Sequence, residues 1–269
     1  MLEKINSPKD LKNLSIKELQ IVSNEVSELI IDTIEEHGGH YSSPLGVVDL
    51  TVALHHCYDS PNDKLVWDVG HQAYAHKILT GRRDSFKTLR QKDGISGFLK
   101  RSESVHDAIG AGHSTTSISS ALGIAHARDY NNKDFNVVSI IGDGAMTGGM
   151  AYEAMNNLGL HRTQQTIILN DNSKSISASV GALSKYLSKI ITNPTYNKIR
   201  SDIWDISGKI PVVSDTIRKF LKKSEEGIKG FLTPGILFEE LGIRYIGPID
   251  GHDIDEMVSV MRYILTYSE

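Results

Sequence analysis

A chain of 269 residues with 39% hydrophobic content is long enough to bury one large core or two small ones. A formal net charge of −4 and a pI near 6.3 give no basic surface for nucleic acid. The single cysteine, Cys57, excludes an internal disulfide framework, and no segment approaches the roughly 18 apolar residues of a membrane span. We therefore expect a cytoplasmic globular protein that binds neither nucleic acid nor membrane.

The first part of the sequence predicts two helices. Ser15 and Glu18 match a capping box, in which each side chain satisfies a backbone N–H group at a helix N-terminus. Apolar residues then recur at helical spacing until the glycines at 38–39, which predict the end of the helix. A second helix is expected to begin near Ser43 and to run through Leu54.

Strand and helix patterns alternate through the rest of the sequence. Short apolar runs predict strands at residues 65–67, 136–141, 165–169 and 243–246, and helical patterns occupy residues 70–81, 114–130, 146–158 and 255–265. This alternation predicts a single α/β domain over residues 1–269, with a mostly parallel, doubly wound sheet and helices on both faces. We expect residues 84–97 to be irregular and interpret residues 184–235, which contain three prolines, as a helical insertion.

Two predicted strands end in turns that carry ligand chemistry. The sequence Gly-Asp-Gly-Ala follows one at 142–145, and Asn-Asp-Asn follows the other at 170–172. Asp143 and Asn172 are about one strand–helix–strand unit apart, which places both at carboxyl ends of parallel strands, where α/β proteins bind ligands. Their oxygens suit Mg2+, and the N–H groups of Gly144 and Ala145 suit phosphate. The motif predicts a diphosphate held by amides and a divalent ion, although either polar residue alone is more often a turn or strand-end residue.

The sequence around this motif resembles a known family. Gly-Asp-Gly at 142–144, a helix, a strand and then Asn172 is similar to the signature of thiamine diphosphate enzymes. Trp-Asp-Val-Gly-His-Gln at 67–72, Gly-His-Ser-Thr-Thr-Ser at 112–117 and Gly-Pro-Ile-Asp-Gly-His-Asp at 247–253 resemble 1-deoxy-D-xylulose-5-phosphate synthases. The resemblance runs from about residue 14 to near the end. It implies a thiamine diphosphate-binding fold and the diphosphate-binding domain of that family, without its pyrimidine-binding and C-terminal domains.

The resemblance also implies a set of binding residues. Mg2+ would be held by the side chains of Asp143 and Asn172 and by the backbone carbonyl of Lys174, with diphosphate oxygens and water completing its shell. The residues expected to contact thiamine diphosphate are His71, Gly112, His113, Ser114, Gly144, Ala145 and Asn172. One departure from the family pattern is Pro44, which has no backbone N–H to donate.

Three histidines directly follow glycines: His40, His71 and His113. The resemblance implies that His40 and His71 face the thiazolium and substrate as catalytic residues, since imidazole can shuttle protons and stabilise oxyanions. His113 is expected on the diphosphate side. His76 is expected to be structural, and His252 is either structural or close to a phosphate.

The function implied by the resemblance is a transferase reaction. Members of the family condense pyruvate with glyceraldehyde 3-phosphate and release carbon dioxide, on the route to isoprenoid precursors, thiamine and pyridoxal. The family's glutamate that holds the cofactor's aminopyrimidine lies on the second domain. We therefore expect this chain to be inactive without a pyrimidine-domain partner, supplied by a second chain or by further domains in a homo- or hetero-oligomer.

Other functions stay open at this stage. The chain is alternatively a non-catalytic cofactor-binding or regulatory module, or one subunit of a split transketolase-like enzyme. A nicotinamide-binding domain is disfavoured. The glycines at 142, 144 and 148 have one residue too many in the second gap of the dinucleotide fingerprint, and Asp143 would face a pyrophosphate with no metal between them.

Overall fold

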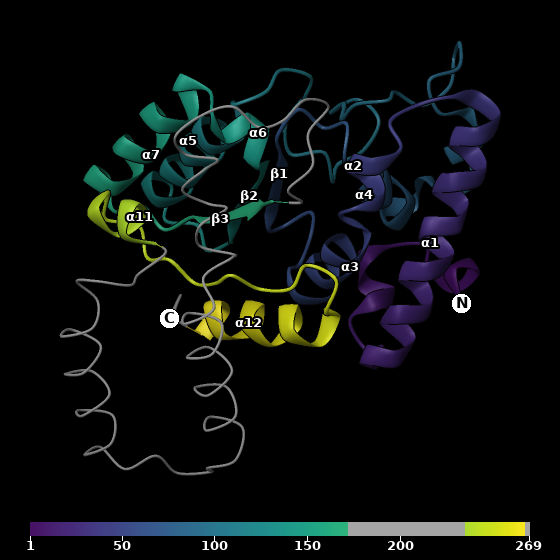
Figure 1. Cartoon of the computed structure of the whole chain (residues 1–269), viewed down its shortest axis with the longest axis horizontal. Helices are drawn as coiled ribbons and strands as arrows, with labels where there is room; N and C mark the ends of the chain where they lie inside the picture. The colour runs from purple at the N-terminus through teal and green to yellow at the C-terminus, as the bar shows by residue number, and fades with distance from the viewer. Residues whose placement is uncertain (172–234, 267–269) are drawn as a thin grey trace. The chain divides into compact units, whose positions relative to one another are not determined.

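The computed structural model describes residues 1–171 and 235–266 (Figure 1). The chain divides into a first unit, Met1–Ile176 with Ile249–Glu269, and a second unit, Ser177–Pro248. Helix α11 (Ile236–Glu240) is the described element of the second unit, and the other described elements belong to the first. Most of the segment predicted as a helical insertion, residues 184–234, lies outside the described residues.

A parallel sheet forms the centre of the first unit. Its described strands, hydrogen-bonded in this order, are β1 (Lys64–Trp67), β2 (Val137–Gly142) and β3 (Thr166–Asn170). Because the strands are parallel, their carboxyl ends lie at one edge of the sheet, where Gly142 pairs with Asn170. An aspartate follows each strand at this edge, namely Asp68, Asp143 and Asp171.

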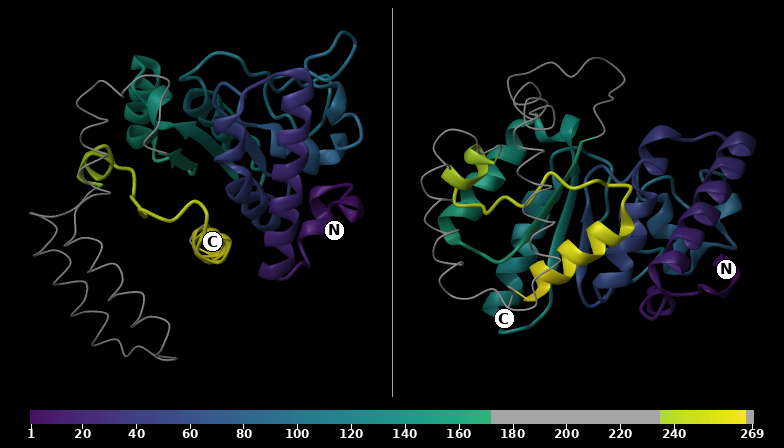
Figure 2. Two further views of the ribbon diagram at one scale, coloured as in Figure 1. Left: turned by 45° about the vertical axis from the view of Figure 1, so that its right-hand side comes forward. Right: turned by 60° about the horizontal axis from the view of Figure 1, so that its bottom comes forward.

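Helices cover both faces of the sheet (Figures 1 and 2). One face carries α1 (Ile16–His37), α3 (Val48–Cys57) and α12 (Ile254–Thr266), and the other carries α5 (Ser117–Tyr130) and α7 (Gly149–His161). Strand pleating explains this arrangement. Leu65 and Trp67 of β1 join the core beneath α1, α3 and α12, whereas Val66 between them packs with Ala121 and Ala125 of α5. The predicted fold class is confirmed.

The first helices follow most of their sequence signals. The N–H of Ser15 donates to Glu18 Oε2 at 2.8 Å and the N–H of Glu18 donates to Ser15 Oγ at 3.4 Å, which completes the capping box of α1. The helix ends at Gly38, whose φ of +75° is the left-handed geometry that glycine adopts without strain. The second predicted helix is two helices, α2 (Ser42–Leu45) and α3, because Val47 leaves helical geometry with φ −127° and ψ 13°.

Two other predicted elements differ in the structure. The helix predicted at 146–158 is preceded by a short helix, α6 (Asp143–Met146), and α7 itself begins only at Gly149. The strand predicted at 243–246 is not formed. The rings of Phe238 and Tyr245 stack with 5.8 Å between their centroids, and the N–H of Ile243 donates to the carbonyl of Phe238 at 2.8 Å. These apolar residues therefore pack against α11 and not in a sheet.

The connection between β1 and α5 is long and mostly irregular. The helix predicted after Gly70 is α4 (Tyr74–Lys77) continuing into the wider turn η3 (Ile78–Arg82), and it ends near Gly81. Residues 83–116 then contain the short 3-10 helix η4 (Phe86–Thr88), and two similar turns, η1 (Leu2–Lys4) and η2 (Pro8–Leu11), precede α1. Across residues 1–171 and 235–266, no helix has the length and apolar character needed to cross a membrane.

Candidate active site

The turn after β2 lies at the carboxyl edge of the sheet, and its backbone is not covered by other atoms at Gly144. Gly142 caps the N-terminus of α6, and the half-buried Asp143 is its first residue, followed by Gly144 and Ala145. A side chain built at Gly144 would meet no atom within 4 Å, so a ligand can approach this backbone closely. The other predicted ligands, Asn172 and Lys174, lie outside the described residues.

A carboxylate at the end of β1 brings a second segment to this turn. Asp68 is only 1% exposed, and its two oxygens accept hydrogen bonds from the N–H groups of Thr115 at 2.8 Å and Ser117 at 3.0 Å. A Cβ at Gly148 would overlap the Thr115 side chain, so the segment lies in close contact with the start of α7. The segment held in this way carries three predicted cofactor-binding residues, Gly112, His113 and Ser114.

These three residues differ in exposure. Gly112 and His113 are exposed and Ser114 is half-buried. His113 Nδ1 lies 2.7 Å from the carbonyl oxygen of Ser114, so Nδ1 carries a proton and donates it to that oxygen. Their contact with a cofactor stays a prediction.

The structure brings His40 and His71 together. Their rings meet edge to face, with 5.1 Å between centroids and an interplanar angle of 64°. Each follows a glycine with positive φ, which is +155° at Gly39 and +86° at Gly70. A Cβ at Gly70 would also lie 2.8 Å from the Cβ of Ala111, so no side chain fits there. The backbone conformation therefore requires glycine immediately before each of these histidines.

The surroundings favour the neutral form of both imidazoles. Burial, and then the positive charge of Arg90, lower the pKa of His40. Burial, and then His40, lower the pKa of His71, against the opposing effect of Asp68. Arg90 Nη1 donates to His40 Nδ1 at 3.3 Å, so the proton of His40 is on Nε2. Among the described residues, His71 Nδ1 is buried without a hydrogen-bond partner.

Three residues of this site were not predicted from the sequence. Asp68 directly follows an apolar strand, so the rule that identified Asp143 also finds it. Tyr74 is fully buried, and its hydroxyl accepts the N–H of His40 at 3.4 Å. Arg90 comes from the polar stretch 84–97. Tyr74 lies in the stretch 67–82 that resembles the family, but no local pattern reveals that Tyr74 or Arg90 contacts His40, because these contacts join distant segments.

The chemistry of the sheet edge fits a metal-bound diphosphate. Asp143 supplies a hard carboxylate oxygen beside the open backbone of Gly144, which suits Mg2+ and phosphate oxygens together. In the described ranges, no three His, Cys, Asp or Glu residues cluster as a metal site. A magnesium ion shared with phosphate and water needs few protein ligands, so Asp143 with the predicted Asn172 and Lys174 would be sufficient.

Comparisons with known proteins identify the family of the chain. The chain matches the family model described as 1-deoxy-D-xylulose-5-phosphate synthase over residues 2–269. It is 53% identical over 262 residues to the 1-deoxy-D-xylulose-5-phosphate synthase of Caldanaerobacter subterraneus, covering 97% of this chain and 42% of that protein. It is 50% identical over 268 residues to the one of Carboxydothermus hydrogenoformans, covering 100% of this chain and 43% of that protein. The chain thus spans about two-fifths of the length of these relatives.

The fold is also similar to solved structures. Transketolase from Campylobacter jejuni matches with a TM-score of 0.68 over 95% of this chain and 37% of that chain. A transketolase variant from Pichia stipitis matches with a TM-score of 0.63 over 95% of this chain and 35% of that chain. At 20% and 16% sequence identity, these likenesses concern the fold alone.

Proposed function

Because the chain belongs to the 1-deoxy-D-xylulose-5-phosphate synthase family, we propose that its first unit binds the diphosphate of thiamine diphosphate through Mg2+. Asp143, Asn172 and the backbone carbonyl of Lys174 hold the ion, and the N–H groups of Gly144 and Ala145 face the phosphate oxygens. The bound cofactor serves a transferase that condenses pyruvate with glyceraldehyde 3-phosphate.

The observation that carries this proposal is the meeting of two segments at the carboxyl edge of the sheet. The close contact between Thr115 and Gly148 places the 112–114 segment beside the helices that follow β2. Asp68 holds that segment in position from the end of β1. Backbone N–H groups, a carboxylate and a small-residue loop on neighbouring strands are the groups that a metal-bound diphosphate requires.

Proton transfer is the role proposed for His40 and His71. When bound, the thiazolium of the cofactor supplies the nucleophilic carbon. A neutral imidazole can accept a proton in one step and return it in the next. Arg90 occupies Nδ1 of His40 with a hydrogen bond, and its charge disfavours the imidazolium, so neutral His40 presents Nε2–H, which can donate to a developing oxyanion.

The chain alone is proposed to bind the cofactor without turning it over. It spans about two-fifths of the length of its curated relatives. The glutamate expected to hold the aminopyrimidine lies outside the matching part of the family. A second chain or further domains would supply it.

Calorimetric titration of the purified chain with thiamine diphosphate tests the binding proposal. We expect binding that requires Mg2+ and is abolished by a chelator. Asp143→Asn should weaken it by more than the ~10-fold that loss of an outer-sphere metal partner costs. Asp63→Asn is the control, because Asp63 is a carboxylate beside the same strands, although more buried than Asp143, and accepts the N–H of Asn136 at 2.7 Å at their opposite ends. Equal binding by the Asp143 variant would contradict the proposal.

A second experiment addresses catalysis. A tagged copy is recovered from its native cell and assayed for glyceraldehyde-3-phosphate-dependent release of carbon dioxide from pyruvate. Activity with a co-purifying chain, lost in Asp143→Ala, would support a two-chain synthase. Substantial turnover by the pure chain would contradict the need for another polypeptide. Metal-dependent binding without activity or partner would favour a cofactor-binding module.

A further inference from the structure

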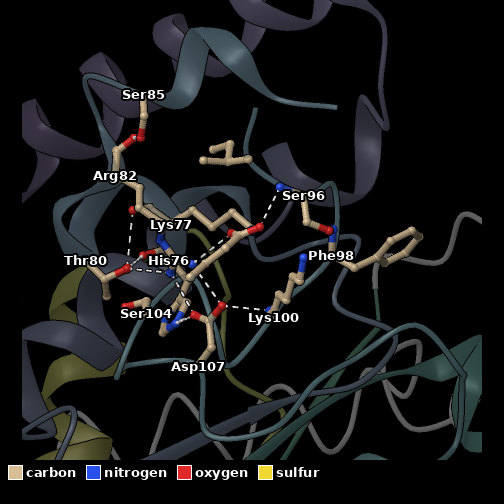
Figure 3. Close-up of polar contacts among 12 residues, drawn as sticks. His76, Lys77, Thr80, Arg82, Ser85, Ser96, Phe98, Lys100, Ser104 and Asp107 are labelled. Atoms are coloured by element: carbon tan, nitrogen blue, oxygen red, sulfur yellow. Dashed lines mark hydrogen bonds and ion pairs between the residues drawn. The ribbon is translucent and has the colours of Figure 1, made fainter. Parts of the chain in front are cut away.

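A cluster of buried charges lies beside the 83–116 connection (Figure 3). Arg82 donates to both carboxylate oxygens of Asp107 at 2.7 and 2.9 Å, and Lys77 Nζ donates to Glu103 at 2.6 Å. Arg82 is 6% exposed, Asp107 is 3% exposed and Lys77 is 0% exposed. Burial of charge is unfavourable unless each ion is paired and hydrogen-bonded. These residues belong to neither the predicted metal site nor the histidine pair.

The two carboxylates hold the backbone of the connection. Glu103 Oε1 accepts the N–H of Ser96 at 2.7 Å. Asp107 Oδ2 accepts the N–H of Lys100 at 2.9 Å (Figure 3). Ser96 and Lys100 flank the stretch 97–99. The two ion pairs therefore fix both ends of this stretch to α4 and η3.

The stretch 97–99 contacts the histidine site at Arg90 and His40. The ring of Phe98 meets the ring of His40 edge to face, with 6.1 Å between centroids. A Cβ at Gly97 would lie 3.0 Å from Arg90 Cγ, so the backbone there runs directly against the arginine side chain. Displacement of the stretch would therefore uncover His40 and release Arg90.

The next residue of the same stretch contacts the turn that carries His71. The backbone nitrogen of Leu99 lies 3.2 Å from the position of a Cβ on Gly70, and the carbonyl of Leu99 accepts the N–H of Ala111 at 3.1 Å. Gly70 directly precedes His71. The stretch 97–99 thus contacts His40 directly and the glycine that precedes His71.

Two buried histidines extend the cluster into the core. His76 Nε2 lies 3.3 Å from Asp107 Oδ1, and His76 Nδ1 lies 3.0 Å from His55 Nε2 on α3. Burial is the main cause that lowers the pKa of each ring, which favours the neutral form of both. His55 Nε2–H then donates to His76, and the Nε2–H of His76 faces the carboxylate. The cluster consequently ties α3 and α4 to the connection as one unit.

We propose that Asp107 and Glu103 are positioning residues for the His40–His71 pair, an inference that rests on the function proposed for these histidines. They act through the backbone of 97–99 and do not themselves touch substrate or cofactor. The buried ion pairs with Arg82 and Lys77 hold the two carboxylates in place, and the carboxylates in turn hold the irregular segment.

An NMR titration of the histidine rings in the full chain tests the proposal. In Asp107→Asn and in Glu103→Gln, one carboxylate oxygen is replaced by a donor, so the basic side chain and the backbone N–H compete for the oxygen that remains. The anchor of 97–99 is weakened, and His40 and His71 become less buried. Their pKa values should then rise toward the ~6.5 of an exposed histidine. Asp63→Asn, which removes a buried carboxylate at the other edge of the sheet, should leave both titrations unchanged. If the pKa values of His40 and His71 in Asp107→Asn and Glu103→Gln are the same as in the wild-type chain, the proposal is overturned.

A double variant separates positioning from stability. Arg82→Met with Asp107→Leu leaves no unpaired buried charge, so it should recover thermal stability that Asp107→Asn loses. The double variant still has no acceptor for the N–H of Lys100, so the pKa values of His40 and His71 should stay raised. Wild-type pKa values of His40 and His71 in this variant would contradict the proposal. If Asp107→Asn does not fold, Glu103→Gln decides, because the Glu103 side chain is 16% exposed and tolerates the change more readily.

The two proposals fail in different ways. The histidine titrations need no cofactor, so a shift in the variants supports positioning whether or not the chain binds thiamine diphosphate. Wild-type chain that does not bind the cofactor contradicts the proposed function alone. Normal cofactor binding with unshifted histidines contradicts the positioning role alone.

Discussion

Arg90 donates a hydrogen bond from Nη1 to Nδ1 of His40 at 3.3 Å, which places a permanent cation against one ring of the histidine pair. The other ring, that of His71, lies 5.1 Å away between centroids. A cation beside a proton-accepting group weakens it as a base and strengthens its conjugate acid. Arg90 therefore lowers the pH at which His40 takes up a proton.

Replacing Arg90 with glutamine should raise the pKa of His40. The rise should be partial, because burial is the larger cause of the lowered pKa and would remain. NMR titration of the His40 ring measures the change. Arg101→Gln, an exposed arginine on the same connection, is the control. A pKa of His40 that stays the same or falls in Arg90→Gln would show that the arginine does not act through its charge.

Asp68→Asn should destabilise the fold and loosen the 112–114 segment. The amide nitrogen of asparagine cannot accept from the N–H of Thr115 or Ser117, so one buried donor is left unpaired at about 1–3 kcal/mol. Urea unfolding measures the loss, and calorimetry should show weaker binding of thiamine diphosphate. Asp129→Asn is a control, since that acid is 48% exposed and should change stability by less than about 1 kcal/mol. Unchanged stability and affinity in Asp68→Asn would remove this residue from the site.

Alanine at two adjacent glycines, Gly148 and Gly149, should change stability by very different amounts. At Gly148 the new Cβ overlaps the Thr115 side chain, so we expect a loss of about 1–3 kcal/mol and weaker cofactor binding. At Gly149 a Cβ meets nothing within 4 Å, and stability should change by less than about 0.5 kcal/mol. Thermal unfolding of both variants measures the difference. Equal losses would mean that helix geometry, and not contact with Thr115, requires these glycines.

Acid should destabilise the protein through His106. Burial lowers the pKa of His106 to about 4, and its Nδ1 pairs with Ser60 Oγ at 2.9 Å. Between an unfolded pKa of about 6.5 and this value, only the unfolded chain binds the proton, so the free energy of unfolding falls by at most about 1.4 kcal/mol per pH unit for this group. His106→Asn should flatten that dependence in urea titrations between pH 6.5 and 4. Above pH 7.5 the two proteins should show parallel dependence, and an unchanged acid slope would contradict the assignment.

Local signals in the sequence predicted most of the first unit. Short apolar runs, the Ser15–Glu18 capping box and the aspartate after an apolar strand are short-range patterns, and they located α1, β1 to β3 and Asp143. The strand predicted at 243–246 was wrong because the same apolar residues also suit packing on a neighbouring helix. An apolar run of this length does not distinguish the two.

The site was predictable only in part. The glycines before His40 and His71 marked positions where the backbone requires positive φ, and those histidines do lie together. Arg90 and the buried charges at Asp107 escaped prediction because each joins segments that only the fold brings into contact. Pro44 is the third residue of α2 and not the first, yet its missing N–H falls in the first turn, where no helical partner exists.

Helix α12 returns from the C-terminal part of the sequence to pack on α3, where Met257, Val258 and Met261 join the core. His252 reinforces this return with Nδ1 at 3.0 Å from Asp49 Oδ2. The first unit is therefore discontinuous, with residues 177–248 inserted between its two parts. A chain cut once within that interval keeps every contact between α12 and α3 available. Two separately expressed pieces, divided there, would be expected to reassociate by fragment complementation.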